Sequence, residues 1–125
     1  MPDTVDTSAS ILQSIKKLLG IIPEAGVFDV DIMIHINTAF NHLTQIGVGP
    51  ETGYRISSED NVWTEFTTDN ILLENVKSFI YIKVKMAFDP PATSALIDAY
   101  NSQLKELEWR IYTQAQHESE EGYYK

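Results

Sequence analysis

The sequence has no cysteine among its 125 residues, which excludes disulfide bonds, thiolate nucleophiles and zinc sites with cysteine ligands. It also lacks long hydrophobic runs: no apolar segment approaches the roughly 20 residues that cross a membrane as a helix. The first ten residues, MPDTVDTSAS, lack the basic and apolar regions of a signal peptide. We therefore expect a cytoplasmic product without a membrane partner.

Positive charge is scarce. The chain has 9 Lys and Arg against 18 Asp and Glu, and its formal net charge is −9. Tight binding to a phosphate backbone needs several basic side chains on one face, and here they are spread along the chain. An acidic surface still tolerates DNA that passes close by, because a repulsive wall does not hold it.

Catalytic and cofactor-binding motifs are missing as well. The glycine-containing segment 47–53, GVGPETG, lacks the Lys and Ser/Thr that complete a phosphate-binding loop. His35 and His42 would lie two helical turns apart, roughly 10 Å, which is too far to share a metal without other ligands. We therefore expect no catalytic residue, no cofactor and no metal site.

Apolar residues recur at helical spacing in four segments, which predicts an all-α fold, a small bundle of about four helices. Gly20 and Gly47 provide the left-handed ends of the first two helices. Their expected N-caps are Ser8 or Ser10 for the first helix and Asp29 or Asp31 for the second. Their predicted buried residues are Ile11, Leu12, Ile15, Leu18 and Leu19, then Ile32, Ile36, Ala39, Phe40, Leu43 and Ile46.

The third predicted helix contains a segment, residues 82–88, that alternates apolar and polar side chains like a strand. Taken with the residues before it, the segment is about 18 residues long, which is too long for an ordinary strand and suits a helix. Pro90 and Pro91 end the third predicted helix. Its expected caps are Thr68, Asp69 or Asn70, and its predicted buried residues include Leu72, Val76, Phe79 and Ile80.

The fourth predicted helix has Thr93 or Ser94 as its expected N-cap and runs to about Gln116. Its core stripe is predicted to be Leu96, Tyr100, Leu104, Leu107 and Ile111. Trp109 lies about 200° from this stripe on the helical wheel, with Tyr112 on the nearest flank. Two interpretations remain open: the loop before the third helix covers both rings, or the rings belong to a subunit or partner interface.

A long loop, residues 47–69, connects the second and third helices. It is rich in turn-forming residues, so we expect a loop that contains a short strand pair or one helical turn. Trp63 and Phe66 are predicted to pin it to the core. The predicted organisation is a flexible N-terminus (1–7), one helical domain (8–116) and an acidic flexible tail (117–125).

Several short motifs, in their order along residues 8–116, resemble the small helical head-tail connector proteins of long-tailed bacteriophages and prophages, also called adaptor or head-completion proteins. The segment that ends in GVGP, the FDPP break and the end of the fourth helix carry the resemblance. The matching stretches include FDVDIMIHINTAFNHLTQIGVGPETGYRI (28–56), VKSFIYIKVKMAFDPPATSAL (76–96) and QLKELEWRIYTQA (103–115).

The resemblance implies an all-α structural protein of the virion neck that forms a ring, typically of twelve copies, beneath the portal protein. Such a ring extends the DNA channel, through which DNA passes without specific binding, and joins the head to a stopper or tail-completion protein. Assembly would take place in the cytoplasm of the bacterial host. A DNA-binding helical module of phage origin, either small-terminase-like or regulatory, is the alternative, and a small enzyme is less favoured.

Within this hypothesis, two groups of residues are candidates for contacts. The fourth helix and the tail supply the candidate contact with the portal or another partner, namely Trp109, Tyr112, Tyr123 and Tyr124. The loop 47–69 supplies the candidate contact between subunits, namely Tyr54, Arg55, Trp63 and Phe66.

Overall fold

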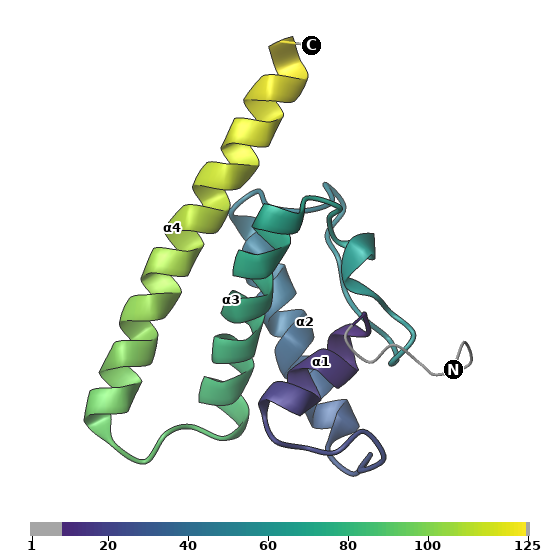
Figure 1. Ribbon diagram of the computed structural model, residues 1–125, viewed down its shortest axis with the longest axis vertical. Helices are drawn as coiled ribbons and strands as arrows, with labels where there is room; N and C mark the ends of the chain where they lie inside the picture. Colours follow the sequence, from purple (N-terminus) through teal and green to yellow (C-terminus); the bar gives the residue numbers. More distant parts are fainter. Residues whose placement is uncertain (1–8, 125) are drawn as a thin grey trace.

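The computed structural model describes residues 9–124 of the chain, with side chains through residue 117. Four α-helices form a bundle (Figure 1). They are α1 (Ile11–Leu18), α2 (Asp29–Gln45), α3 (Asn70–Phe88) and α4 (Ser94–Tyr124), and a short 3-10 turn, η1 (Trp63–Glu65), lies in the loop between α2 and α3. The predicted all-α bundle is confirmed. The predicted N-terminal segment 1–7 lies outside the described residues.

The helix α3 occupies the centre of the bundle, between α2 and α4 (Figure 1). It is buried on more than one side because neighbours contact both of its faces. The alternating segment 82–88 is the second half of this helix, as predicted, and Asp89 ends it before the two prolines. Its buried residues are Leu72, Leu73, Val76, Phe79, Ile80, Ile82 and Val84.

Side-chain caps start three of the helices at predicted positions. The Thr93 hydroxyl oxygen accepts a hydrogen bond from the backbone N–H of Leu96 at the start of α4. The Ser10 hydroxyl accepts a hydrogen bond from the backbone N–H of Gln13 at the start of α1. The Asp69 carboxylate accepts from the N–H groups of Ile71 and Leu72 at the start of α3. All three caps satisfy backbone donors that the first turn of a helix leaves without partners.

The predicted aspartate cap of α2 is wrong. Phe28 occupies the cap position and makes no side-chain cap hydrogen bond. Asp29 is instead the first residue of the helix, and its carboxylate Oδ1 lies 2.9 Å from Nζ of Lys16. The Lys16 side chain is fully buried and also donates to the carbonyl oxygen of Pro23 at 3.0 Å. A buried ammonium group is costly unless it is paired, so Asp29, which the sequence pattern assigned to capping, forms an ion pair with Lys16 instead.

The loop 47–69 is pinned to the core by Trp63 and Phe66, as predicted. Trp63 is 2% exposed and Phe66 is 4% exposed. The indole N–H of Trp63 donates to Oγ of Ser14, and a Cβ on Gly49, whose φ is +93°, would overlap the Phe66 ring. The loop contains the helical turn η1. In place of a strand pair, the described residues show one isolated bridge, which joins Val62 to Ser10 outside the loop.

The last helix is longer than predicted. It continues past Gln116 through residues assigned to a tail and ends at Tyr124. The segment HESEEGYYK contains no proline, and glutamate has a good helix propensity, so nothing local stops the helix where the apolar stripe ends.

Two predicted core residues are exposed, Leu18 at 54% and Leu96 at 51%, because each lies at the end of its helix, beyond the neighbouring elements that would cover it.

The ion pair between Lys16 and Asp29 yields a stability prediction. Asp29→Asn leaves the buried ammonium group without a carboxylate, and we expect a loss of about 3 kcal/mol in the free energy of unfolding, measured by urea denaturation. The matched control is Asp31→Asn, an exposed carboxylate in the same helical turn, which should change stability by less than about 1 kcal/mol. Equal losses in the two variants would contradict a special role for this pair.

Candidate interaction surface

The helix α4 lies on the bundle along one side only. It packs on α3, and among its described side chains Ile111 alone is buried. Two polar contacts tie it further: His42 Nε2 lies 2.9 Å from Glu108 Oε1, and Gln114 Nε2 donates to Asp69 Oδ2 at 3.1 Å. The opposite side of α4 therefore faces solvent along most of its length.

Trp109 and Tyr112 lie on this outer side. Trp109 is 67% exposed and Tyr112 is 45% exposed. The interpretation in which the loop 47–69 covers both rings is therefore wrong. The aromatic residues of that loop pack against the core formed by α1, α2 and α3. Together with Ile46, Lys105 and Glu108, the two rings line a shallow hollow of about 460 Å³. Exposed aromatic rings around a hollow are typical of a surface that a partner covers.

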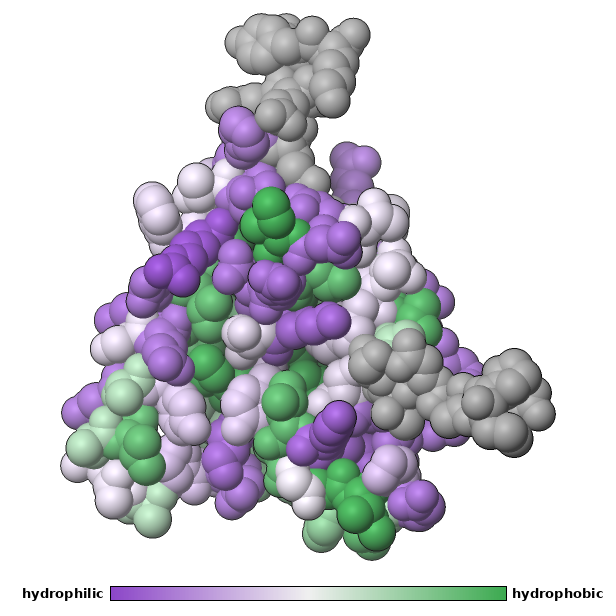
Figure 2. Space-filling model, in the orientation of Figure 1, coloured by the Kyte–Doolittle hydropathy of each residue, from purple (hydrophilic) through white to green (hydrophobic). Residues whose placement is uncertain are grey.

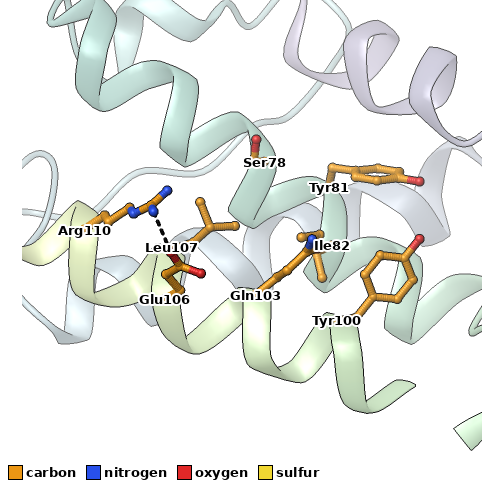
Figure 3. Close-up of a pocket in the computed structure, with 8 residues that line it drawn as sticks. All are labelled: Ser78, Tyr81, Ile82, Tyr100, Gln103, Glu106, Leu107 and Arg110. Atoms are coloured by element: carbon orange, nitrogen blue, oxygen red, sulfur yellow. Dashed lines mark hydrogen bonds and ion pairs between the residues drawn. The ribbon is translucent and has the colours of Figure 1, made fainter. Parts of the chain in front are cut away.

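A second hollow, of about 300 Å³, lies on the other flank of α4, where that helix meets α3. Figure 3 shows the hydroxyl groups of Tyr81 and Tyr100 at one end and the ion pair of Glu106 with Arg110 at the other. Burial raises the pKa of the Tyr81 hydroxyl, and the nearby Tyr100 raises it further. The other residues that line this second hollow are Ser78, Ile82, Gln103 and Leu107. The arrangement joins two helices and contains no nucleophile paired with a base.

The four candidate residues of the loop 47–69 separate into two groups. Trp63 and Phe66 belong to the core, so their side chains are not available on the surface of this subunit. Tyr54 is partly buried against the Phe40 ring, at 5.0 Å between ring centres. Arg55 is exposed and lines a polar hollow of about 310 Å³ beside α2.

Glu65 organises the hydrogen bonds of this loop. Its Oε1 accepts from the Tyr54 hydroxyl at 2.6 Å, from Asn61 Nδ2 at 3.0 Å and from the Val62 N–H at 3.3 Å. The hydrogen bond from Tyr54 lowers the pKa of the Glu65 carboxyl, and Asn61 adds to the effect. Burial raises the pKa of Tyr54, and the contact with Glu65 raises it further. This network joins Tyr54, Asn61, Val62 and Glu65 within the loop.

The comparison with protein families decides between the function classes that the sequence left open. The model of a family described as phage connector protein matches residues 11–118. This chain belongs to the phage connector protein family. Comparisons with curated proteins and with solved structures gave no match.

Membership in the phage connector family identifies a structural component of the virion that joins head and tail parts. In the described part of the connector, no helix is both long and apolar enough to span a membrane. No group of three or more potential metal ligands is found there either. The side chains of Tyr123 and Tyr124, two of the candidate contact residues, lie outside the described residues.

One exposed surface of the connector escaped the sequence analysis. Five apolar residues are exposed where the chain passes from α1 into α2, and we call them the corner patch: Ile22, Val27, Phe28, Val30 and Ile34. Figure 2 shows apolar side chains at the lower edge of the molecule, where this corner lies in Figure 1. The missed signal was that Val30 and Ile34 lie four residues apart, opposite the buried stripe of α2.

The Glu65 network yields a prediction about pH. Because the folded state lowers the pKa of Glu65 below its ordinary value of 4.5, its contribution to stability is fully present above that value. It is lost as the pH falls through the lowered pKa. Glu65→Gln should therefore destabilise the connector at pH 7, and the difference from the unaltered chain should shrink between pH 5 and pH 3, in urea denaturations at each pH.

The control for this prediction is Glu51→Gln, an exposed residue of the same loop, which should leave the free energy of unfolding unchanged at both ends of the range. A difference between Glu65→Gln and the unaltered chain that grows on acidification would contradict the assignment.

Proposed function

We propose that this connector forms a ring beneath the portal protein of a DNA-filled phage head, where it extends the DNA channel and offers a docking surface to a stopper or tail-completion protein. The observation that carries the proposal is the outer face of α4. That face exposes Trp109 and Tyr112, although the chain has a complete core elsewhere. An exposed aromatic face is expected of a subunit that works by assembly.

The charge of the chain supports the placement around DNA. Each copy has a formal net charge of −9, so a ring of about twelve copies would carry on the order of a hundred negative charges. Such a wall repels the phosphate backbone and leaves the genome free to move. Assembly of the ring takes place in the cytoplasm of the bacterial host, and the finished ring belongs to the neck of the virion.

The C-terminal end of α4 supports a contact with the portal. The last turns of the helix extend beyond the other three helices (Figure 1), and Tyr123 and Tyr124 lie within them. An extended helical end reaches a neighbouring ring without disturbing the bundle that carries it. The loop 47–69, through Tyr54 and Arg55, lies on a different element and is available to a neighbouring subunit.

The proposal predicts that the chain binds the portal protein of its own phage and that the outer face of α4 contributes to this binding. Trp109→Ala should weaken retention on purified portal particles at least about tenfold, because buried aromatic anchors dominate interface energies. The measurement is co-sedimentation over a concentration series. The helical content, followed by circular dichroism, should not change, since the exposed indole ring of Trp109 makes little contact with the core.

The matched control is Ile71→Ala, which truncates an equally exposed apolar residue on α3, at 64% exposure. It should bind the portal as well as the unaltered chain does. An unaltered chain that fails to bind the portal would overturn the proposed function, and equal retention of Trp109→Ala and Ile71→Ala would remove α4 from it.

A further inference from the structure

The corner patch is apolar, and the segment that carries it is acidic. Its most exposed members are Val27 at 81%, Val30 at 66% and Ile22 at 65%. Residues 20–34 contain three carboxylates and no Lys or Arg. Asp29 pairs with Lys16, and the other two carboxylates, Glu24 and Asp31, form no ion pair with another described residue. A surface that covers this patch must therefore be apolar and must bring positive charge.

The part of the chain that the structure describes carries one surface of that kind. Trp109, Tyr112 and Lys105 line the same hollow on α4, and we call these three residues the α4 patch. The hollow is also lined by Glu108, whose carboxylate contacts His42 of its own subunit at 2.9 Å. Lys105 is exposed and forms no ion pair within the part of the chain that the structure describes.

The other cations of the described residues are less suitable partners for the corner patch. Lys16, Lys85 and Arg110 have carboxylate partners, and Lys77 and Lys83 lie over aromatic rings of their own subunit. Lys17 and Arg55 are exposed but line no hollow with an exposed aromatic ring. Among the cations with described side chains, apolar area and free positive charge therefore coincide at Lys105 alone.

We propose that the corner patch of one copy binds the α4 patch of the next copy. The contact rests on the proposed function, and it names the partner of the outer face of α4 as a second copy of this chain. Because the two patches lie on different elements, the contact is head to tail, and head-to-tail contacts generate rings when the rotation closes. Trp109 and Tyr112 then contact the neighbouring subunit and strengthen retention on the portal by joining the copies of the ring, whereas the C-terminal end of α4 contacts the portal itself.

The absence of cysteine permits a direct test. One preparation carries Ile34→Cys and an affinity tag, and a second, untagged preparation carries Tyr112→Cys. The two are mixed and treated with a short bis-maleimide, both free at high concentration and bound to portal particles. We expect a mixed cross-linked dimer between the tagged and untagged chains, at least about tenfold more abundant than when Ile71→Cys, an exposed site outside both patches, replaces Tyr112→Cys.

Charge reversal gives an independent measurement. Asp31→Lys or Lys105→Glu, each introduced into both cysteine preparations, should lower the yield of the mixed dimer about tenfold, because each replaces an attraction across the contact by a repulsion. The combination of both changes in one chain should restore the yield. Circular dichroism of the free variants checks that the fold is kept.

Three outcomes would overturn the inference: cross-links that form only between like patches, a mixed dimer no more abundant than with Ile71→Cys, or no restoration by the combined charge reversal. These outcomes are distinguishable from a failure of the proposed function. A chain that binds the portal without the mixed cross-link refutes this contact and leaves the connector role standing, whereas a chain that does not bind the portal refutes that role.

Discussion

The arrangement of the molecule depends on burying α3 from two opposite sides. Its apolar residues cover more of its circumference than one neighbour can bury, so α2 and α4 must lie on different faces of it. The helix α2 brings α1 and the loop 47–69 with it, and these elements complete a core around Phe40. The helix α4 brings no further element with it and packs mainly on α3. Its inner side is fixed by α3, and its outer side is left for contacts with other molecules.

The helices were predictable because each is encoded locally, by apolar spacing, a cap or a break. The cap of α2 was not predictable, because it depends on an ammonium group thirteen positions away in the chain: the Asp29 carboxylate pairs with the buried Lys16 and does not cap the helix. The end of α4 was missed because a helix of polar residues needs no apolar stripe to continue. The corner patch was missed because the apolar residues of α2 were assigned to one face, although Val30 and Ile34 occupy the other.

The aromatic residues show why the candidate contacts were only partly predictable. Trp63 and Trp109 are residues of the same type, yet Trp63 lies in the core and Trp109 is exposed. The periodicity of α4 placed Trp109 on the outer face correctly, since a helix fixes the direction of its side chains. A loop has no period, so nothing in the sequence shows whether Trp63 and Phe66 point inward. Burial in a loop is decided by tertiary packing, here by the space that Gly49 leaves for the Phe66 ring.

The single-sided attachment of α4 also separates the molecule into two units of different cooperativity. The core contains side chains from α1, α2, the loop and α3, and among the described side chains of α4 Ile111 is the one fully buried residue that this helix adds to it. Detaching α4 thus exposes far less apolar surface than unfolding the bundle does, and the helix belongs to the low end of the range of local opening free energies. A subunit built in this way adjusts the angle of its longest helix to fit a neighbour while its core stays folded, which suits a joint between two assemblies of unlike shape.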